Sequence, residues 1–259
     1  MVKGLYTAYT GMIHQEHRMD VLTNNLANAD TNGYKKEGAT AQSFDAMLAY
    51  KIKDTSEGYR NAKRLGRNNP GVKIGEGYTD FSQGPLKETS LPYDLALTDK
   101  GFFTVEFTSK TGETSVKYTR DGNFTLTEDG HLITQDGDFV LNDEGEPIQI
   151  STIAADTSIN VLGQIIQDGK VVGKLKITDF EDYNYLKRYG ENYFEPIEGA
   201  KEKEAPASVY AGFLETSNMS VVSEMVDMIT VSRAYESNQK VITTIDGTLE
   251  IAANQIGKV

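Results

Sequence analysis

Hydrophobic residues recur every seven positions near the start of the chain, over about residues 3–28. The row and its companion row three positions later are Leu5, Met12, Met19 and Leu26, and Ala8, Gln15, Leu22 and Ala29. Two rows with this offset are the a and d positions of a helix that pairs with another helix. The Asn- and Gly-rich run at 24–33 contains Asn28 and Gly33 and ends the predicted helix.

The same spacing returns over about residues 217–257. The two rows are Val221, Met228, Tyr235, Ile242, Leu249 and Ile256, and Glu224, Val231, Asn238, Ile245 and Ala252. The run Thr216-Ser217-Asn218 offers good N-cap residues for this second helix. A helix of that length extends roughly 60 Å, which is too long for the interior of such a domain.

The middle of the chain has a different pattern. Residues 34–75 are polar and rich in Lys, Arg, Asn and Gly, which favours an extended linker. Residues 76–210 alternate short β-prone runs with glycine turns, and Asp-Gly pairs at 121–122, 129–130, 136–137 and 168–169 are typical of hairpins. This part is predicted to be a β-rich domain of short strands.

The predicted fold is therefore α+β, with an inserted β-rich domain and terminal helices that pair as a coiled coil. The expected divisions are an axial helix and turn at 1–33, the linker at 34–75, the β-rich domain at 76–210 and a second axial helix at 211–259. The polar positions Gln15, Glu224 and Asn238 interrupt the hydrophobic rows, and we expect them to fix the register of the pair.

Composition narrows the range of functions. Among 259 residues the net charge is −12, which disfavours nucleic-acid binding and binding to anionic membranes. The chain has no cysteine, so disulfides and thiolate metal sites are excluded. No apolar run is long enough for membrane insertion, and if a protein with this start leaves the cytoplasm, it is expected to do so without a cleaved signal peptide.

Candidate catalytic and metal-binding motifs are weak. His14 and His17 are near a carboxylate but do not form a known zinc motif, and surface histidines explain them better. The aspartates between 129 and 143 lack calcium-loop spacing, and the glycines at 71–77 lack the context of a phosphate loop. The sequence therefore predicts no catalytic residue, no cofactor and no metal.

Two terminal motifs identify a family. The run from Asn24 to Lys35, Asn-Asn-Leu-Ala-Asn-Ala-Asp-Thr-Asn-Gly-Tyr-Lys, resembles the first signature of flagellar rod and hook proteins. The run from Gly212 to Ile229 and the segment Arg233-Ala-Tyr-Glu-Ser-Asn238 resemble the second. Central runs at 95–103 and 118–124 agree, and chain length is nearest to the distal rod proteins.

The resemblance implies a structural subunit and not an enzyme. Such subunits are exported by the flagellar type III apparatus and assemble helically, as homo-oligomers next to other rod and hook proteins, into a hollow torque-transmitting axle of the basal body. The expected assembly interface is Leu5, Met12, Met19, Leu22, Leu26, Asn28, Gly33, Val221, Met228, Val231, Tyr235, Asn238, Ile242, Ile245, Leu249 and Ile256.

One alternative hypothesis is a carbohydrate-binding or glycan-processing β-domain whose helical ends serve only to oligomerise it. The tyrosines at 183, 185, 189 and 193, with Phe194, motivate it. Packing of these rings against a sheet explains them more simply.

Overall fold

The computed structural model describes residues 2–44, 47–51, 63–69, 71–109, 112–151, 157–190 and 192–256. The chain divides into two compact units. Unit 1 comprises the described parts of Met1–Leu26, Glu37–Thr79 and Val221–Val259. Unit 2 comprises Ala27–Lys36 and Asp80–Ser220.

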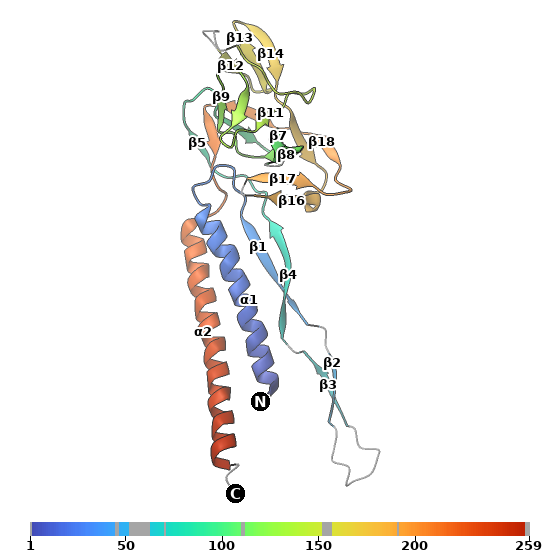
Figure 1. Cartoon of the computed structure of the whole chain (residues 1–259), viewed down its shortest axis with the longest axis vertical. Helices are drawn as coiled ribbons and strands as arrows, with labels where there is room; N and C mark the ends of the chain where they lie inside the picture. Colours follow the sequence, from blue (N-terminus) through green and yellow to red (C-terminus); the bar gives the residue numbers. More distant parts are fainter. Residues whose placement is uncertain are drawn as a thin grey trace. The chain divides into compact units, whose positions relative to one another are not determined.

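Unit 1 contains the two long helices, which lie side by side in Figure 1. Helix α1 spans Val2–Ala27, and α2 spans Val221–Ile251 before a π-helical turn, η3, at Ala252–Ile256. Both predicted helices are therefore present. Because α2 begins at Val221, the predicted N-cap run at 216–218 precedes the helix.

The predicted coiled coil is wrong, although the helices do pair. They run antiparallel, with Gly4 facing Ile245 and Gly11 facing Asn238. On α1 these glycines precede the predicted a positions by one residue, and a glycine has no side chain to act as a knob in a neighbouring hole. Within the described part of α2, only Glu224 and Val231 are buried. Ala29 lies beyond α1, and Ile256 lies in the π-helical turn.

Unit 1 also contains two β-hairpin ribbons, in the stretch predicted to be an extended linker. Strand β1 (Glu37–Ser43) pairs antiparallel with β4 (Val72–Thr79), with a bulge between Ala39 and Ala41. Strand β2 (Met47–Lys51) pairs antiparallel with β3 (Lys63–Asn68). The chain leaves and re-enters unit 2 at one point, because Asp80 N–H donates to Lys36 O at 2.8 Å.

Unit 2 is built on a sheet of nine strands among the described residues. The order β16-β17-β8-β7-β11-β10-β9 is extended by β15, which pairs with β7 and β18. The strands are β7 Phe102–Thr108, β8 Thr114–Thr119, β9 Phe124–Leu126, β10 Leu132–Thr134, β11 Phe139–Val140, β15 Ile177–Phe180, β16 Leu186–Tyr189, β17 Tyr193–Pro196 and β18 Glu202–Glu204. A short 3₁₀ helix, η2, spans Tyr183–Tyr185.

Three smaller sheets complete unit 2. A three-stranded sheet contains β12 (Thr157–Ile159), β13 (Gln164–Gln167) and β14 (Lys170–Lys174). Strand β6 (Leu95–Thr98) pairs with β19 (Ser208–Ala211). Strand β5 (Leu86–Glu88) pairs with β20 (Phe213–Glu215).

Three of the predicted Asp-Gly hairpins are confirmed and one is wrong. The turns at 129–130, 136–137 and 168–169 connect paired strands. The pair at 121–122 joins β8 to β9, which do not pair with each other. A Cβ on Gly122 would clash with the main chain of Leu95, so this glycine serves close packing between segments.

Two hydrophobic clusters hold unit 2 together. The larger contains Leu95, Leu97, Phe103, Val105, Phe124, Leu132, Val140, Ile148, Ile150, Ile165, Leu175, Tyr193 and Val209. The smaller contains Phe102, Tyr118, Phe180 and Phe194. Phe81 and Tyr183 pack on the smaller cluster, with ring centroids 4.8 Å apart.

Candidate assembly interface

Asn25 joins three segments of unit 1. Its Nδ2 donates to Glu37 O at 2.9 Å and to Glu224 Oε2 at 3.2 Å, while its Oδ1 accepts from Glu37 N–H at 3.0 Å. Asn25 and Glu224 are both 0 % exposed. Only an amide side chain offers a donor and an acceptor to one main-chain residue in this way. The side chain therefore ties α1 to both β1 and α2.

The turn after α1 belongs to unit 2 and needs a glycine. Thr31 Oγ1 bonds Asn28 Oδ1 at 3.2 Å, which closes the turn. Gly33 has a φ of +67°, and a Cβ there would lie 2.5 Å from the main chain at Arg120 and Asp121. The position combines a left-handed backbone with a close approach, and both favour glycine.

A buried ionic cluster follows the turn. Lys35 Nζ lies 2.6 Å from Glu215 Oε1, and Arg120 Nη1 lies 3.3 Å from Glu215 Oε2. Gly84 N–H also donates to Glu215 Oε1, at 2.8 Å, and Lys35 Nζ donates to Ser82 O. Burial lowers the pKa of Lys35, although the Glu215 carboxylate opposes that shift by raising it. The cluster links residue 35 to residue 215 without access of water.

Asn218 adds a second link between the same segments. Its Oδ1 accepts from Lys36 N–H at 2.8 Å. Its Nδ2 donates to the carbonyl oxygens of Asp80 and Ser82, at 2.8 and 3.1 Å. The side chain of this predicted cap residue therefore binds Lys36, directly after the first terminal motif, and the main chain at Asp80 and Ser82.

The structure distributes the predicted interface residues over both units. Leu22 and Val231 are buried, while Val221 and Leu249 are each 42 % exposed. Asn28 and Gly33 lie in the turn of unit 2. Those that are partly exposed on the helices are Leu5, Met12, Met19, Leu26, Met228, Tyr235, Asn238, Ile242 and Ile245. Ile256 lies in η3. Of these residues, the structure brings Asn238 and Ile245 against α1.

Three protein-family models match this chain, at its two ends and in its centre. The model described as "Flagella basal body rod protein" matches residues 5–35, "Flagellar hook protein FlgE/F/G D1 domain" matches 96–167, and "Flagellar basal body rod FlgEFG protein C-terminal" matches 210–256. The "Flagellar hook-basal body complex protein FlhO" of Bacillus subtilis is 32 % identical, with 100 % of each chain covered. The "Flagellar basal-body rod protein FlgG" of Caulobacter vibrioides is 34 % identical over 96 % of this chain and 97 % of its own length. The protein of the same name from Agrobacterium fabrum is 33 % identical over 98 % and 100 %.

The chain belongs to the flagellar basal-body rod and hook protein family. It is a structural rod subunit of the FlgG type, and the family implies assembly with other rod and hook proteins in the flagellar basal body. Among the described residues, no helix is both long and apolar enough to cross a membrane.

The structure explains why the family motifs contain these residue types. Asn25, Gly33 and Lys35 of the first motif each make a specific contact, and Glu215 and Glu224 of the second supply the partners. Sequence reasoning missed the bonds of Asn25 in unit 1, and it missed Lys35, Arg120 and Glu215 as a connected set in unit 2. These residues stand within the family motifs, but an ion pair such as Lys35–Glu215, whose members are 180 residues apart, leaves no periodic pattern in the sequence.

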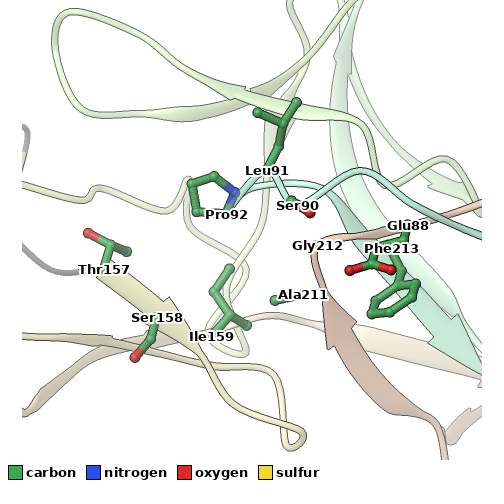
Figure 2. A pocket seen from close by; sticks show the side chains of 10 residues that line it. All are labelled: Glu88, Ser90, Leu91, Pro92, Thr157, Ser158, Ile159, Ala211, Gly212 and Phe213. Carbon is green, nitrogen blue, oxygen red and sulfur yellow. The ribbon is translucent and has the colours of Figure 1, made fainter.

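The described part of unit 2 contains an open cavity. Figure 2 shows an open cavity of about 330 Å³ between the loop after β5, strand β12 and the start of β20. It is lined by Glu88, Ser90, Leu91, Pro92, Thr157, Ser158, Ile159, Ala211, Gly212 and Phe213. Glu88 is the single carboxylate among these, whereas glycoside hydrolysis ordinarily uses two.

The tyrosines that motivated the carbohydrate hypothesis serve packing for the most part. Tyr193 and Phe194 are buried, and Tyr183 stacks on Phe81 and donates to Asp179 Oδ1 at 2.7 Å. None of the matched families supports that hypothesis. His14 is buried on α1, and burial, with Arg18 and His17 nearby, lowers its pKa. No three His, Asp or Glu residues of the described chain cluster as metal ligands would.

Proposed function

We propose that the chain polymerises helically into the hollow, torque-transmitting part of the rod, with α1 and α2 as its axial interface. The interface includes the residues predicted from the sequence, from Leu5 to Leu26 on α1, from Val221 to Leu249 on α2, and Ile256 in η3. The subunit is exported by the flagellar type III apparatus and lies outside the cytoplasmic membrane. Family membership supports each of these statements.

The observation that carries the proposal is an apolar strip on α2 that unit 1 leaves exposed. Val222, Met225, Val226 and Ile229 are exposed by 73, 51, 57 and 53 %. Their spacing of three and four residues places them on one face of the helix. Tyr6 and Tyr9 on α1 are also more than half exposed. Apolar surface of this kind on a soluble subunit marks a site of protein association.

Polymerisation of purified subunits tests the proposal. Ile229→Glu should raise the concentration needed for polymerisation by about tenfold or more, because each contact between subunits would lose an isoleucine side chain that polymerisation buries. Gln239→Glu, at an exposed polar position on the same helix, is the matched control. Deletion of residues 1–26 or 221–259 should abolish polymerisation while unit 2 still folds. Rods built by either truncated chain would refute the proposal.

Export can be tested separately. Secretion of the full chain should stop in a strain whose flagellar type III apparatus is inactivated, and should not depend on the general secretory route. Continued secretion in that strain would refute this part of the proposal alone.

A further inference from the structure

Two short segments, one that follows α1 and one that precedes α2, are bonded to each other within unit 2. Gly33 N–H donates to Glu215 O at 2.7 Å, and Lys36 N–H donates to Asn218 Oδ1 at 2.8 Å. The Lys35–Glu215 ion pair lies between these two bonds in the sequence. We call residues 33–36 and 215–218 together the clip.

We propose that the clip forms as part of unit 2, before and independently of helix pairing, and thereby directs α1 to pair with the α2 of its own chain. The inference rests on the proposed function, because its role is to keep helices from pairing wrongly where many subunits meet. Lys35, Glu215 and Asn218 are positioning residues in this sense.

The side chains of Lys35, Glu215 and Asn218 make their bonds within unit 2. Lys35 Nζ binds Ser82 O and Glu215, and Glu215 binds Gly84 N–H and Arg120. Asn218 binds the main chain of Asp80 and Ser82. All these groups belong to unit 2. Lys35 and Glu215 are each 1 % exposed, so the clip has the burial of a core element.

The clip removes most of the entropic cost of bringing the helices together. Asn25 and Glu224, which bond between the helices, are separated by 199 residues of sequence. Once the clip has formed, only a few residues separate Gly33 from the end of α1 and Glu215 from the start of α2. Short tethers of this kind give effective concentrations of about the millimolar level.

The helix pair needs such help because its own contacts are sparse. Its facing residues include Gly4 and Gly11, and most of the described part of α2 is exposed. An isolated helix with few tertiary contacts is marginally stable in water. A helix from another subunit could offer equivalent contacts, and the tether is what favours the helix of the same chain.

The absence of cysteine from the chain makes a cross-linking test straightforward. A Cβ on Gly11 would lie 3.5 Å from Asn238 Cγ, so Gly11→Cys with Asn238→Cys should form an intrachain disulfide in dilute, full-length subunits. Gly4→Cys with Asn238→Cys, one heptad out of register, should not. Adding Asn218→Ala should slow the matched disulfide by about tenfold, because loss of the Asn218 side-chain bonds frees residues 216–218 and lengthens the tether between the clip and α2.

Asn142→Ala is the matched control, because the Asn142 side chain, like that of Asn218, bonds main-chain groups: its Oδ1 accepts from Glu144 N–H and Glu146 N–H, at 2.9 Å each, in a distant turn of unit 2. It should leave the disulfide rate unchanged. Equal rates with and without Asn218→Ala would overturn the proposal. Polymerisation of the Asn218→Ala variant is a separate readout. Slower disulfide formation together with normal polymerisation would support the clip and refute the helix pair as the axial interface.

Hydrogen exchange on the unaltered full chain gives an independent test that requires no variant. The amides of Gly33 and Lys36 should exchange as slowly as the core strands of unit 2, and more slowly than the amides of α1 and α2. Exchange of these two amides at the rate of the helices would overturn the proposal.

Discussion

Lys35 Nζ lies 2.6 Å from Glu215 Oε1, and both side chains are excluded from water. Arg120 shares the same carboxylate, so one buried anion is bonded to two buried cations. This asymmetry makes Glu215 the residue on which the cluster depends, since its loss leaves two like charges buried together.

Glu215→Gln should therefore destabilise unit 2 more than Lys35→Met does. Removing one partner of a buried ion pair costs about 3–5 kcal/mol, and the methionine variant still leaves Glu215 paired with Arg120. Urea denaturation followed by near-ultraviolet circular dichroism measures both. Asp143→Asn, which breaks the exposed Lys174–Asp143 pair at 2.8 Å, is the control and should cost no more than about 1 kcal/mol. Equal costs for all three variants would contradict the prediction.

Asn25→Ala should destabilise unit 1 by about 2 kcal/mol, because it leaves polar groups of Glu37 and Glu224 buried with one partner fewer. Asn25→Asp should cost more at neutral pH, since it places a second carboxylate beside Glu224. Helical circular dichroism during thermal unfolding reports the loss. Thr23→Ala, at an exposed position two residues before Asn25, should change little. An aspartate variant as stable as the parent would disprove the role of this amide.

The stability of unit 2 should depend on Asp121 in mildly acidic solution. Burial raises the pKa of this carboxyl to about 6 from 3.8, and Asp136 and Asp94 add to the shift. The folded state therefore binds the proton more tightly than the unfolded state between about pH 4 and 6. Stability consequently falls as the pH rises through this window, and stays lower above it.

Asp121→Asn should remove this dependence and stabilise unit 2 above about pH 6. The difference in unfolding free energy between variant and parent isolates Asp121 from the other carboxyl groups. Asn192 Oδ1 is buried without a hydrogen bond and can accept from the new amide after its own amide rotates. A difference that stays constant from pH 4 to 8 would rule out the raised pKa.

Gly33→Ala should be among the most damaging single changes in unit 2. The alanine Cβ would meet immovable main chain at 2.5 Å, in addition to the strain of a positive φ. Gly169→Ala is the control, because Gly169 has a φ of +77° but has no atom near its added Cβ. It should cost about 1 kcal/mol. Thermal midpoints that fall equally for the two variants would show that crowding at residue 33 is unimportant.

The sequence predicted those features that repeat at short range. The seven-residue rows located both helices, and Asp-Gly pairs located three hairpins, because periodicity and turn chemistry are local. On α1 the row that contains Leu5 and Met12 lies one residue away from Gly4 and Gly11, which face α2, since the row registers apolar side chains and not the glycines that permit close approach. Nothing local distinguishes Lys35 from its neighbour Lys36, although only one of the two enters the buried cluster.

The main-chain bond from Asp80 N–H to Lys36 O also has a consequence for how such a chain can vary. The segment between Lys36 and Asp80 starts and ends at neighbouring points, so the fold of unit 2 does not depend on the number of residues in that segment. Insertions and deletions can accumulate in that excursion without disturbing the sheet, the clip or the hydrophobic clusters. Relatives should therefore differ in length most freely within residues 37–79, and a variant with that segment replaced by a tight turn should retain a folded β unit.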